Sequence, residues 1–374
     1  MPSPVPRNIV HVLRAPLGGL FRHVVDLARG QAARGHRVGV IADASSGGAR
    51  AEATLAELSQ TLALGLSRVS MSRQIGVRDA PALAHVARRA AEVAADVIHG
   101  HGAKGGAYAR LARNARAVRA YTPHGGSLHY RWSTPAGLLY LAAERAMMPR
   151  TDLFLFESRY GLNAFCAKIG DPGRRAQVVH NGVGADEFVP VATDPAAGDL
   201  VFIGELRHLK GVDVLIEAIA QLARQGRRVT ATIVGEGPDR AAFEQAAMPL
   251  GEAVRFVGAL PARRAFARGR LLIVPSRAES LPYVVLEAAA AGRPLIATNV
   301  GGIPEIFGPD AAGLVPPGDP AALARAIAGA LAKPQDLAAT ALQLRQRVRD
   351  AFSTDAMTQA VLAAYDEAFA HRHG

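Results

Sequence analysis

Short apolar runs alternate with amphipathic helical patterns along the whole chain, and this alternation occurs twice. In the first half, the runs at 8–13 and 37–42 flank a helical pattern. In the second half, the runs at 199–206 and 229–237 flank another over 212–226. Mostly apolar strands joined by helices form parallel sheets that are covered on both faces. The sequence therefore predicts an α/β fold with two Rossmann-like, doubly wound parallel-sheet domains that face a cleft.

The linker between the two domains is predicted at 189–199, where Pro, Ala and Asp are frequent and no apolar periodicity is present. A chain of 374 residues is also longer than one ordinary core requires. We therefore expect an N-terminal, acceptor-binding domain over 1–188 and a C-terminal, nucleotide-sugar-binding domain over 189–355. A helix over 356–374 could return to pack on the N-terminal domain.

The net charge of +11 lies entirely in the first half of the chain. Residues 1–190 hold 24 Lys and Arg against 13 Asp and Glu, and the remainder is balanced. A basic N-terminal half favours an anionic partner such as a membrane surface or a phosphorylated acceptor, and an arginine-rich composition is the plain alternative. Nucleic acid is not expected, because aromatic side chains do not interleave with the basic ones.

Two further features bear on membrane association. Arginines recur at every third residue, and we expect them around half of one helix, as a docking surface or a solvated face: Arg110, Arg113, Arg116 and Arg119. No apolar run approaches the roughly 18 residues of a membrane span, and the single cysteine, Cys166, excludes an internal disulfide. We therefore expect a cytoplasmic protein that could attach peripherally to the inner face of the cell membrane.

The segment 275–305 carries two carboxylates eight positions apart, Glu279 before a predicted helix and Glu287 inside it. If this helix begins near Pro282, Glu287 can accept hydrogen bonds from ribose hydroxyls and Glu279 can meet a sugar. Backbone N–H groups at the positive end of the helix can hold a phosphate, namely those near Ser280, Leu281 and Tyr283. The segment predicts a nucleotide-sugar site, with solvated carboxylates as the plain alternative.

Two cations lie upstream, in the loop between an apolar strand and a helix that is predicted to begin near Val212. Arg207 offers a bidentate fork and Lys210 a point charge, so together they can neutralise a leaving diphosphate. A solvated basic loop is the alternative, but the position at the carboxyl end of a strand favours a functional role.

Two glycine turns could also contact the ligand. Gly18 and Gly19 lie between a strand and a helix, where consecutive glycines let backbone N–H groups approach an anion. Gly235 lies in a turn before another predicted helix and could contact the nucleotide. An ordinary turn between strand and helix is the alternative for both.

His124 ends a predicted strand and could contact a sugar hydroxyl, although a lone histidine in this position is more often structural. His99 and His101 are spaced like metal ligands, but no acid or cysteine clusters near them in the sequence. The chain also contains no Asp-x-Asp pair. We therefore expect no metal site.

In this order, the motifs resemble those of the family 4 retaining glycosyltransferases, whose GT-B architecture has two Rossmann-like domains. The resemblance covers nearly all of residues 8–370. Besides the two glutamates and Lys210-Gly211, it rests on VVHNGV at 178–183 and GGIPEI at 301–306. It points to the bacterial cell-envelope or exopolysaccharide type.

The resemblance implies that Glu287 binds the ribose, that Glu279 and His124 contact the donor sugar, and that Arg207 and Lys210 hold the diphosphate. Gly18-Gly19 would close on a phosphate of the donor or acceptor. The resemblance also implies retention of the anomeric configuration without a metal or other cofactor, since the nucleotide sugar is a co-substrate.

The chain departs from the family pattern in two places. Glu205 stands where the family often has an arginine, directly after the glycine of the basic loop. Ser280-Leu281-Pro282 stands where the family often has glycines, and Pro282 removes one N–H from the expected phosphate cradle.

We therefore expect a retaining glycosyltransferase that moves a sugar from a UDP- or GDP-linked donor to an acceptor hydroxyl on a lipid-linked, envelope or exopolysaccharide saccharide. A sugar-nucleotide epimerase of the same fold and a transferase to a soluble small-molecule acceptor are the alternatives. A Rossmann oxidoreductase is disfavoured because the first turn between strand and helix, at Gly18-Gly19, does not carry the G-x-G-x-x-G fingerprint, and no acid other than Asp43 stands at the end of the second strand to bind a ribose. A non-catalytic binding protein would not require the complete set of cleft residues.

Overall fold

The computed structural model describes residues 5–114 and 116–373, which form two compact units. The division falls between Gly182 and Val183 and again between Ser353 and Thr354. The first unit therefore combines the N-terminal part of the chain with its last helix, and the second unit takes in the residues between. The chain leaves the first unit a few residues before the predicted linker at 189–199.

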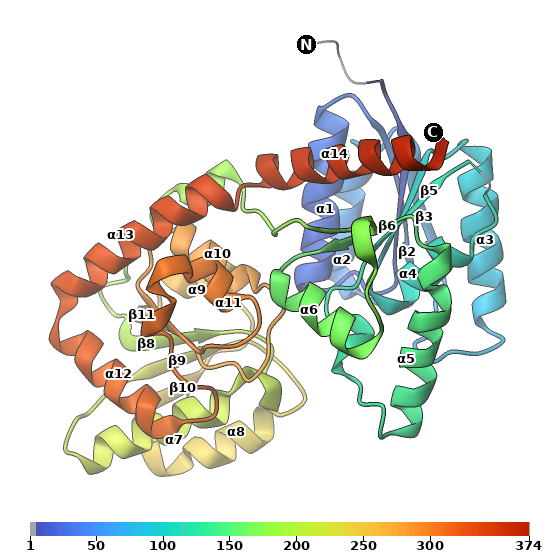
Figure 1. Cartoon of the computed structure of the whole chain (residues 1–374). Helices are drawn as coiled ribbons and strands as arrows, with labels where there is room; N and C mark the ends of the chain where they lie inside the picture. Colours follow the sequence, from blue (N-terminus) through green and yellow to red (C-terminus); the bar gives the residue numbers. More distant parts are fainter. Residues whose placement is uncertain (1–4, 115, 374) are drawn as a thin grey trace. The chain divides into compact units, whose positions relative to one another are not determined.

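The first unit is built on a sheet that has seven strands among the described residues, in the order β3-β2-β1-β4-β5-β6-β7 (Figure 1). Every pairing in it is parallel. Because the strand order reverses between β1 and β4, the carboxyl ends of these two strands flank a topological switch point, where α/β proteins bind ligands. The strands are β1 (Asn8–Leu13), β2 (Arg37–Asp43), β3 (Gly65–Val69), β4 (Val97–His101), β5 (Val118–Thr122), β6 (Leu153–Phe156) and β7 (Ala176–Val178).

Helices join the successive strands of the first unit and bury apolar side chains on them. The helices are α1 (Gly18–Ala33), α2 (Gly48–Ser59), α3 (Asp79–Glu92), α4 (Gly102–Leu111), α5 (Pro135–Met147), α6 (Arg159–Lys168) and α14 (Thr354–His373). Strands β4 and β6 are buried along their whole length, as expected for strands covered on both faces.

Helix α14 returns from the end of the second unit to pack on the first (Figure 1). Met357, Val361 and Tyr365 are buried against strands β1, β4, β5 and β6 and helix α1. Gly30 of α1 allows the close approach, because a Cβ there would lie 2.3 Å from Thr358 Oγ1. The chain therefore ends on the unit in which it began.

The second unit has a parallel sheet with five strands among the described residues, in the order β10-β9-β8-β11-β12. Its switch point lies between β8 and β11. The strands are β8 (Gly198–Ile203), β9 (Ala231–Val234), β10 (Val254–Phe256), β11 (Gly269–Val274) and β12 (Leu295–Ala297). The helices are α7 (Val212–Arg224), α8 (Arg240–Ala247), α9 (Ala262–Phe266), α10 (Tyr283–Ala290), α11 (Ile303–Phe307), α12 (Pro320–Ala332) and α13 (Pro334–Ala351). The predicted fold class of two parallel-sheet α/β domains is confirmed.

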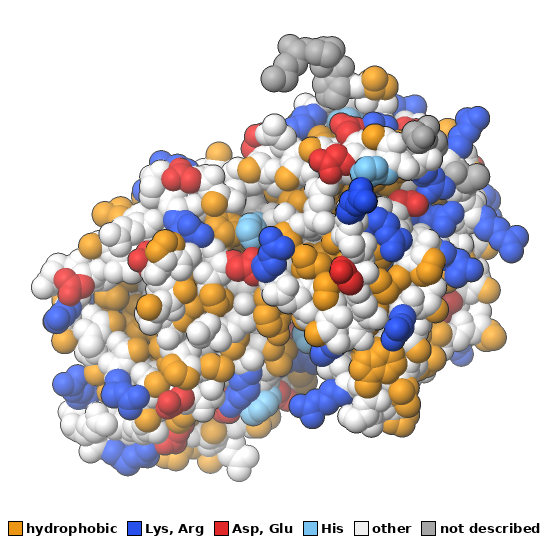
Figure 2. All heavy atoms as spheres, in the orientation of Figure 1, with side chains coloured by type: hydrophobic (Ala, Val, Ile, Leu, Met, Phe, Trp, Pro, Cys, Tyr) orange, Lys and Arg blue, Asp and Glu red, His pale blue; other side chains and the backbone are white. Residues whose placement is uncertain are grey.

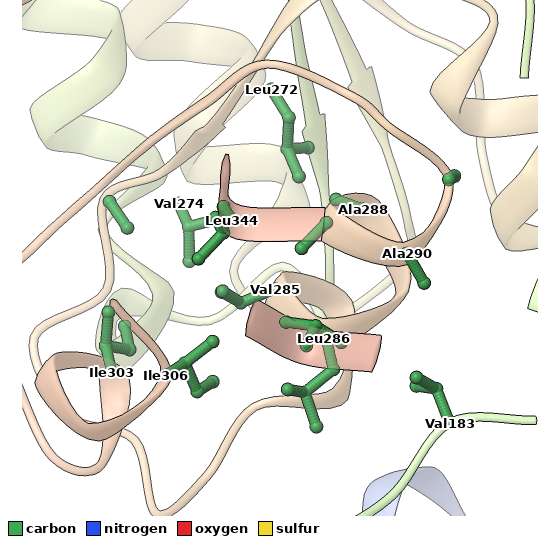
Figure 3. Close-up of a cluster of buried hydrophobic side chains, with 14 of the residues drawn as sticks. Val183, Leu272, Val274, Val285, Leu286, Ala288, Ala290, Ile303, Ile306 and Leu344 are labelled. Atoms are coloured by element: carbon green, nitrogen blue, oxygen red, sulfur yellow. The ribbon is translucent and has the colours of Figure 1, made fainter. Parts of the chain in front are cut away.

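Helix α10 lies in the centre of an apolar cluster of the second unit (Figure 3). Val285 and Leu286 are fully buried, together with residues of β11, of α11 and of α13 such as Leu344. A helix that is apolar on nearly all sides is fixed by packing rather than by helix propensity. The position of Glu287 is therefore set by the core of the unit.

The prediction that four arginines share one helix is wrong. Arg110 lies in α4, which ends one residue later, and Arg119 lies in β5. Between them, Asn114 Oδ1 accepts hydrogen bonds from the backbone N–H groups of Arg116 and Ala117, so a side-chain turn leads the chain into β5. In addition, none of the helices in the described part of the chain is both long and apolar enough to cross a membrane.

Arg110 is not a surface residue. Its side chain is fully buried, and its guanidinium lies 2.8 Å from Glu144 and 3.8 Å from the ring centroid of Tyr121. Glu144 also accepts hydrogen bonds from the hydroxyls of Tyr121 and Ser127. This arginine therefore belongs to a buried polar cluster behind β5.

Candidate functional site

The loop from β8 to α7 is held against the end of β11 by one glycine. Gly211 has φ +71°, and a Cβ there would lie 2.0 Å from the carbonyl oxygen of Pro275. Only glycine allows this contact. Helix α7 begins directly afterwards, at the predicted Val212. Lys210 is therefore fixed at the carboxyl edge of the sheet, next to the switch point.

Lys210 and Glu279, 69 residues apart in the sequence, meet at this edge. Lys210 Nζ donates to Glu279 Oε1 at 2.7 Å, and Ser276 Oγ donates to the same oxygen at 2.7 Å. The Glu279 side chain is 9% exposed and that of Lys210 is 27% exposed, so both can be reached from solvent. A charge-assisted pair at a switch point can exchange its internal contact for a charged, hydroxyl-rich ligand.

The backbone around Glu279 is held by the glycine pair of the GGIPEI segment. Gly301 has φ +60°, and a Cβ there would lie 1.8 Å from the carbonyl oxygen of Glu279. The N–H of Gly302 donates to the carbonyl of Ser280 at 2.7 Å. These contacts make the glycine pair a support for the loop that carries Glu279.

The predicted phosphate-binding residues lie at the start of α10. Pro282 is the N-cap in an extended conformation, and Tyr283 opens the helix, as predicted. Ser280 and Leu281 precede the cap, and Leu281 and Tyr283 are buried. Glu287 follows in the second turn and is half-buried. The structure thus gathers these residues at one helix end.

Arg207 does not join the contact between Lys210 and Glu279. Its side chain is half exposed and forms an ion pair with Glu205 at 3.7 Å. Arg277 supports the basic loop instead, because its guanidinium donates to both carboxylate oxygens of Asp213 and to the carbonyl of His208. Burial opposes ionisation of Asp213, but the Arg277 hydrogen bonds hold the pKa of Asp213 below its usual range.

Gly235 is required for packing. It has φ +147°, and a Cβ there would lie 1.8 Å from the carbonyl oxygen of Gly204. Its N–H already donates to the carbonyl of Gly258 at 2.8 Å. The glycine thus brings the turn after β9 against the start of the basic loop, and a nucleotide contact at this position stays a prediction.

In the first unit, Gly18 and Gly19 lie exposed at the start of α1, just beyond the carboxyl end of β1. Gly18 has φ +63°, and a Cβ there would meet only open space. The positive φ therefore explains why a glycine occupies position 18. Helix α1 begins at the switch point, where a helix N-terminus can bind an anion.

His124 lies beyond the end of β5 with φ +50°, which is uncommon for a residue other than glycine. Both of its ring nitrogens have partners: Nδ1 lies 3.0 Å from Glu157 Oε1, and Nε2 lies 3.1 Å from His101 Nδ1. The predicted contact of His124 with a sugar hydroxyl therefore requires one of these contacts to open.

His124 belongs to a buried group of histidines behind this loop. His101 contacts His11 at 2.9 Å, and His11 contacts Gln31 at 2.8 Å. Burial lowers the pKa of His11 to about 4 and holds the pKa of His101 well below its usual range. These two imidazoles are therefore neutral at physiological pH.

Sequence reasoning missed three members of this group. His23 of α1 packs its ring 4.8 Å from that of His124. Asn181 Oδ1 accepts a hydrogen bond from His23 Nδ1 at 2.9 Å, and Glu157 follows β6. Burial opposes ionisation of Glu157, but its contact with His124 holds the pKa of Glu157 below its usual range. For His23 and Glu157 the only sequence signal was a position near the carboxyl end of a predicted strand or in the first turns of the following helix, whereas Asn181 lies in the VVHNGV segment at 178–183.

Both halves of the chain match known glycosyltransferase families in sequence. Residues 197–333 match the family described as Glycosyl transferases group 1, and residues 17–187 match Glycosyltransferase Family 4. The glycogen synthase of Mycobacterium tuberculosis is 30% identical over 246 residues, which is 63% of this chain and 59% of that protein. The chain spans about half to two thirds of the length of the curated relatives it matches first.

Solved structures share the fold over nearly the whole chain. Sucrose-phosphate synthase from Thermosynechococcus elongatus superposes with a TM-score of 0.81 at 22% identity. The match spans 98% of this chain and 100% of the synthase chain. HepE of Anabaena, in complex with UDP-glucose, superposes with a TM-score of 0.78 at 22% identity. The match spans 96% of this chain and 100% of the HepE chain. At these identities the likeness establishes the architecture only.

Proposed function

Because the chain belongs to the family 4 glycosyltransferases with the GT-B fold, we propose that it transfers a sugar from a nucleoside-diphosphate sugar to an acceptor hydroxyl with retention of configuration. The observation that carries the proposal is the 2.7 Å contact between Lys210 Nζ and Glu279 Oε1 beside the β8/β11 switch point. It joins a cation for the diphosphate to an acid for the sugar within one unit.

The donor would replace this internal contact. Its diphosphate would take Lys210, with Arg207 and the N–H groups at the start of α10 as further partners, and its sugar hydroxyls would take Glu279. Glu287 would accept hydrogen bonds from the ribose. The acids would thus serve as donor contacts, and the cation would stabilise the charge that develops on the leaving group.

The transfer step requires no side-chain base. The bond from the anomeric carbon to the phosphate oxygen breaks, and a bond to the acceptor oxygen forms on the same face. The acceptor proton passes to the leaving phosphate oxygen. Because Lys210 and Arg207 supply the positive charge, no metal ion is needed at the diphosphate.

We favour UDP or GDP as the nucleotide. The complex of HepE with UDP-glucose supports a uridine nucleotide, because HepE shares the fold over 96% of this chain. Base contacts made by the backbone leave no mark on residue identity, so a guanine nucleotide fits the same loops.

A lipid-linked or envelope saccharide at a membrane surface is the acceptor we favour. Helix α5 and the loop before it expose apolar side chains, with Leu138 and Leu139 each 54% exposed and Trp132 39% exposed. Figure 2 shows hydrophobic side chains over α5 with Lys and Arg side chains around them. Arg131 and Arg145 are exposed on the same segment. Aromatic, aliphatic and cationic groups together suit an anionic bilayer interface.

The membrane partner has its own test. Flotation with vesicles of anionic lipid should capture the protein at low salt, and capture should weaken as salt rises. Leu138→Ser with Leu139→Ser should release it, whereas Leu342→Ser, an exposed leucine of α13, should not. Equal release by both variants would contradict a specific role of Leu138 and Leu139, and no capture of the wild type at low salt would favour a soluble small-molecule acceptor.

Product analysis tests the reaction itself. The full chain should release UDP or GDP from a sugar nucleotide only when an acceptor from a membrane lipid or saccharide extract is present. Conversion of the donor sugar to its epimer with donor alone would instead support an epimerase. Absence of both products across UDP- and GDP-linked donors would contradict the proposal.

A further inference from the structure

Three imidazoles of the first unit converge at the carboxyl end of its sheet. His23 comes from α1, His101 ends β4, and His124 follows β5. One ring nitrogen of each lies within 4.8 Å of the others, as in a group that can bind a metal ion. The side chains of His23 and His101 are buried, and that of His124 is 6% exposed.

The spacing of the rings matches three ligands of one tetrahedral ion. With a Zn–N distance of about 2.1 Å and a nitrogen about 1.1 Å from the ring centre, the ring centres should lie about 5 Å apart and the nitrogens about 3.4 Å apart. The observed centroid distances are 4.8 Å, 5.4 Å and 5.6 Å. His101 Nδ1 and His124 Nε2 lie 3.1 Å apart.

Each imidazole is also oriented from behind by a partner on its far nitrogen. His23 Nδ1 contacts Asn181 Oδ1, His101 Nε2 contacts His11 Nδ1, and His124 Nδ1 contacts the Glu157 carboxylate, at 2.9, 2.9 and 3.0 Å. A far nitrogen that donates leaves the near nitrogen with a lone pair. Such outer partners, and a carboxylate above all, are what metal-binding histidines have.

His23 supplies an observation that a hydrogen-bonded pair of histidines does not explain. Within residues 5–114 and 116–373, its Nε2 is buried without a hydrogen-bond partner. A buried polar atom left alone costs about 1–3 kcal/mol. A contact between His101 and His124 alone would leave His23 in that state, whereas a shared ion would satisfy all three near nitrogens.

From this geometry we propose that His23 Nε2, His101 Nδ1 and His124 Nε2 bind one Zn²⁺ ion, with a fourth position open to water or another oxygen ligand. Neutral imidazoles in tetrahedral geometry suit zinc. Catalytic zinc sites in proteins typically have three protein ligands and one open position.

The neighbouring group of His11, His99 and His101 does not fit an ion. Both ring nitrogens of His99 already have hydrogen-bond partners. Nδ1 lies 2.7 Å from the hydroxyl of Tyr365, and Nε2 lies 2.8 Å from the hydroxyl of Thr122. Its ring centre also lies only 4.0 Å from that of His101. His11 and His99 therefore support the site from behind.

The zinc site is independent of the diphosphate contacts, which belong to the second unit. The family resemblance implies a contact between His124 and the donor sugar, and zinc would compete with that sugar for the His124 Nε2. A zinc-bound Nε2 has no lone pair or proton for a sugar hydroxyl, so an occupied site would move the sugar contact to another group.

Metal analysis of the full chain, purified without a histidine tag, tests the proposal. The wild type should carry about one zinc ion per chain by elemental mass spectrometry. His23→Ala and His101→Ala should lose it, while His85→Ala, a partly exposed histidine of α3 outside the group, should keep it. Glu157→Gln should weaken zinc affinity about 10–100-fold in a chelator competition.

A second readout covers variants that fail to fold. Co²⁺ added to metal-free wild type should give the visible absorption of a tetrahedral site. Metal-free wild type that takes up neither ion tightly, or His23→Ala with wild-type metal content, would overturn the proposal and leave His101 and His124 as a hydrogen-bonded pair. Neither readout depends on sugar transfer, so nucleotide binding tests the proposed function separately.

Discussion

Replacing Lys210 with methionine should abolish most of the transfer rate while leaving the fold in place. Methionine keeps the length and most of the apolar stem of lysine and removes only the charge. In the variant, Glu279 Oε1 still accepts a hydrogen bond from Ser276, so the acid is not left without a partner. The change therefore isolates the contribution of the cation.

Two magnitudes separate a catalytic cation from a structural one. The pair with Glu279 is partly exposed, with 27% of the Lys210 side chain in contact with solvent. Its loss should therefore lower the free energy of unfolding by only about 1 kcal/mol. Loss of a preorganised charge at the leaving group should lower kcat by about 10²–10³, or about 2.7–4 kcal/mol of transition-state stabilisation.

Rates of nucleotide release with saturating donor and acceptor give kcat, and urea denaturation gives the stability. Lys333→Met is the matched control, because Lys333 is an exposed lysine of the same unit and forms only a weak surface pair with Asp336 at 4.0 Å. Its kcat should stay within about twofold. The reasoning would be refuted by a Lys210→Met enzyme with near-normal kcat, or by a loss of stability as large as the loss of transition-state energy.

Three further changes test the fold. Glu144→Leu should lower the free energy of unfolding by about 3–5 kcal/mol, because Arg110 would remain buried and unpaired; a loss below about 1 kcal/mol in urea denaturation would contradict this. Gly30→Ala should lower Tm, because its Cβ would lie 2.3 Å from a side chain of α14, whereas Gly329→Ala points into open space and should not; equal shifts in thermal melts would argue against the packing. Burial opposes ionisation of Asp43, but hydrogen bonds from two serine hydroxyls and two backbone N–H groups hold its pKa below the usual 3.8. Its carboxylate therefore contributes stability that is present above about pH 3.8 and lost as pH falls through the folded-state pKa. Asp43→Asn should accordingly be less stable than wild type at neutral pH and converge with it on acidification, and a pH-independent gap would count against this.

Much of the fold was predictable because it follows from local patterns. Apolar runs predicted strands β1, β2, β8 and β9, and the helices that begin at Val212 and Tyr283 start at or next to the predicted positions. The row of arginines was misread because its spacing suits a helix, whereas α4 ends at Leu111 and a side-chain turn at Asn114 follows it. Periodicity alone does not detect a three-residue turn.

The candidate site divides in the same way. Lys210 and Glu279 could be chosen because both follow strands, and the carboxyl ends of parallel strands share one edge. The group around His124 could not, because His23 and Glu157 come from segments far apart in the sequence and carry no common motif. Their association depends on the order of strands β1, β4, β5 and β6 in the sheet.

The charge of Arg110 illustrates a further limit. As a residue type it suggests an exposed, basic surface, yet it lies fully buried beside Glu144. Composition gives the amount of charge but does not tell which charged side chains are buried. The exposed residues around α5 are therefore a better guide to a membrane-binding surface of the protein than the number of arginines.

Nucleotide binding by the full chain tests the central claim, a nucleoside-diphosphate sugar site beside the β8/β11 switch point, most directly. A ligand at about 100 times its Kd stabilises the folded protein by about 2.7 kcal/mol, enough to raise the melting temperature by several degrees. The account predicts such a rise with UDP or GDP, and its loss in Glu287→Ala but not in Glu244→Ala, an exposed acid of α8. No shift with UDP, GDP or ADP, or an unchanged shift in Glu287→Ala, would contradict it.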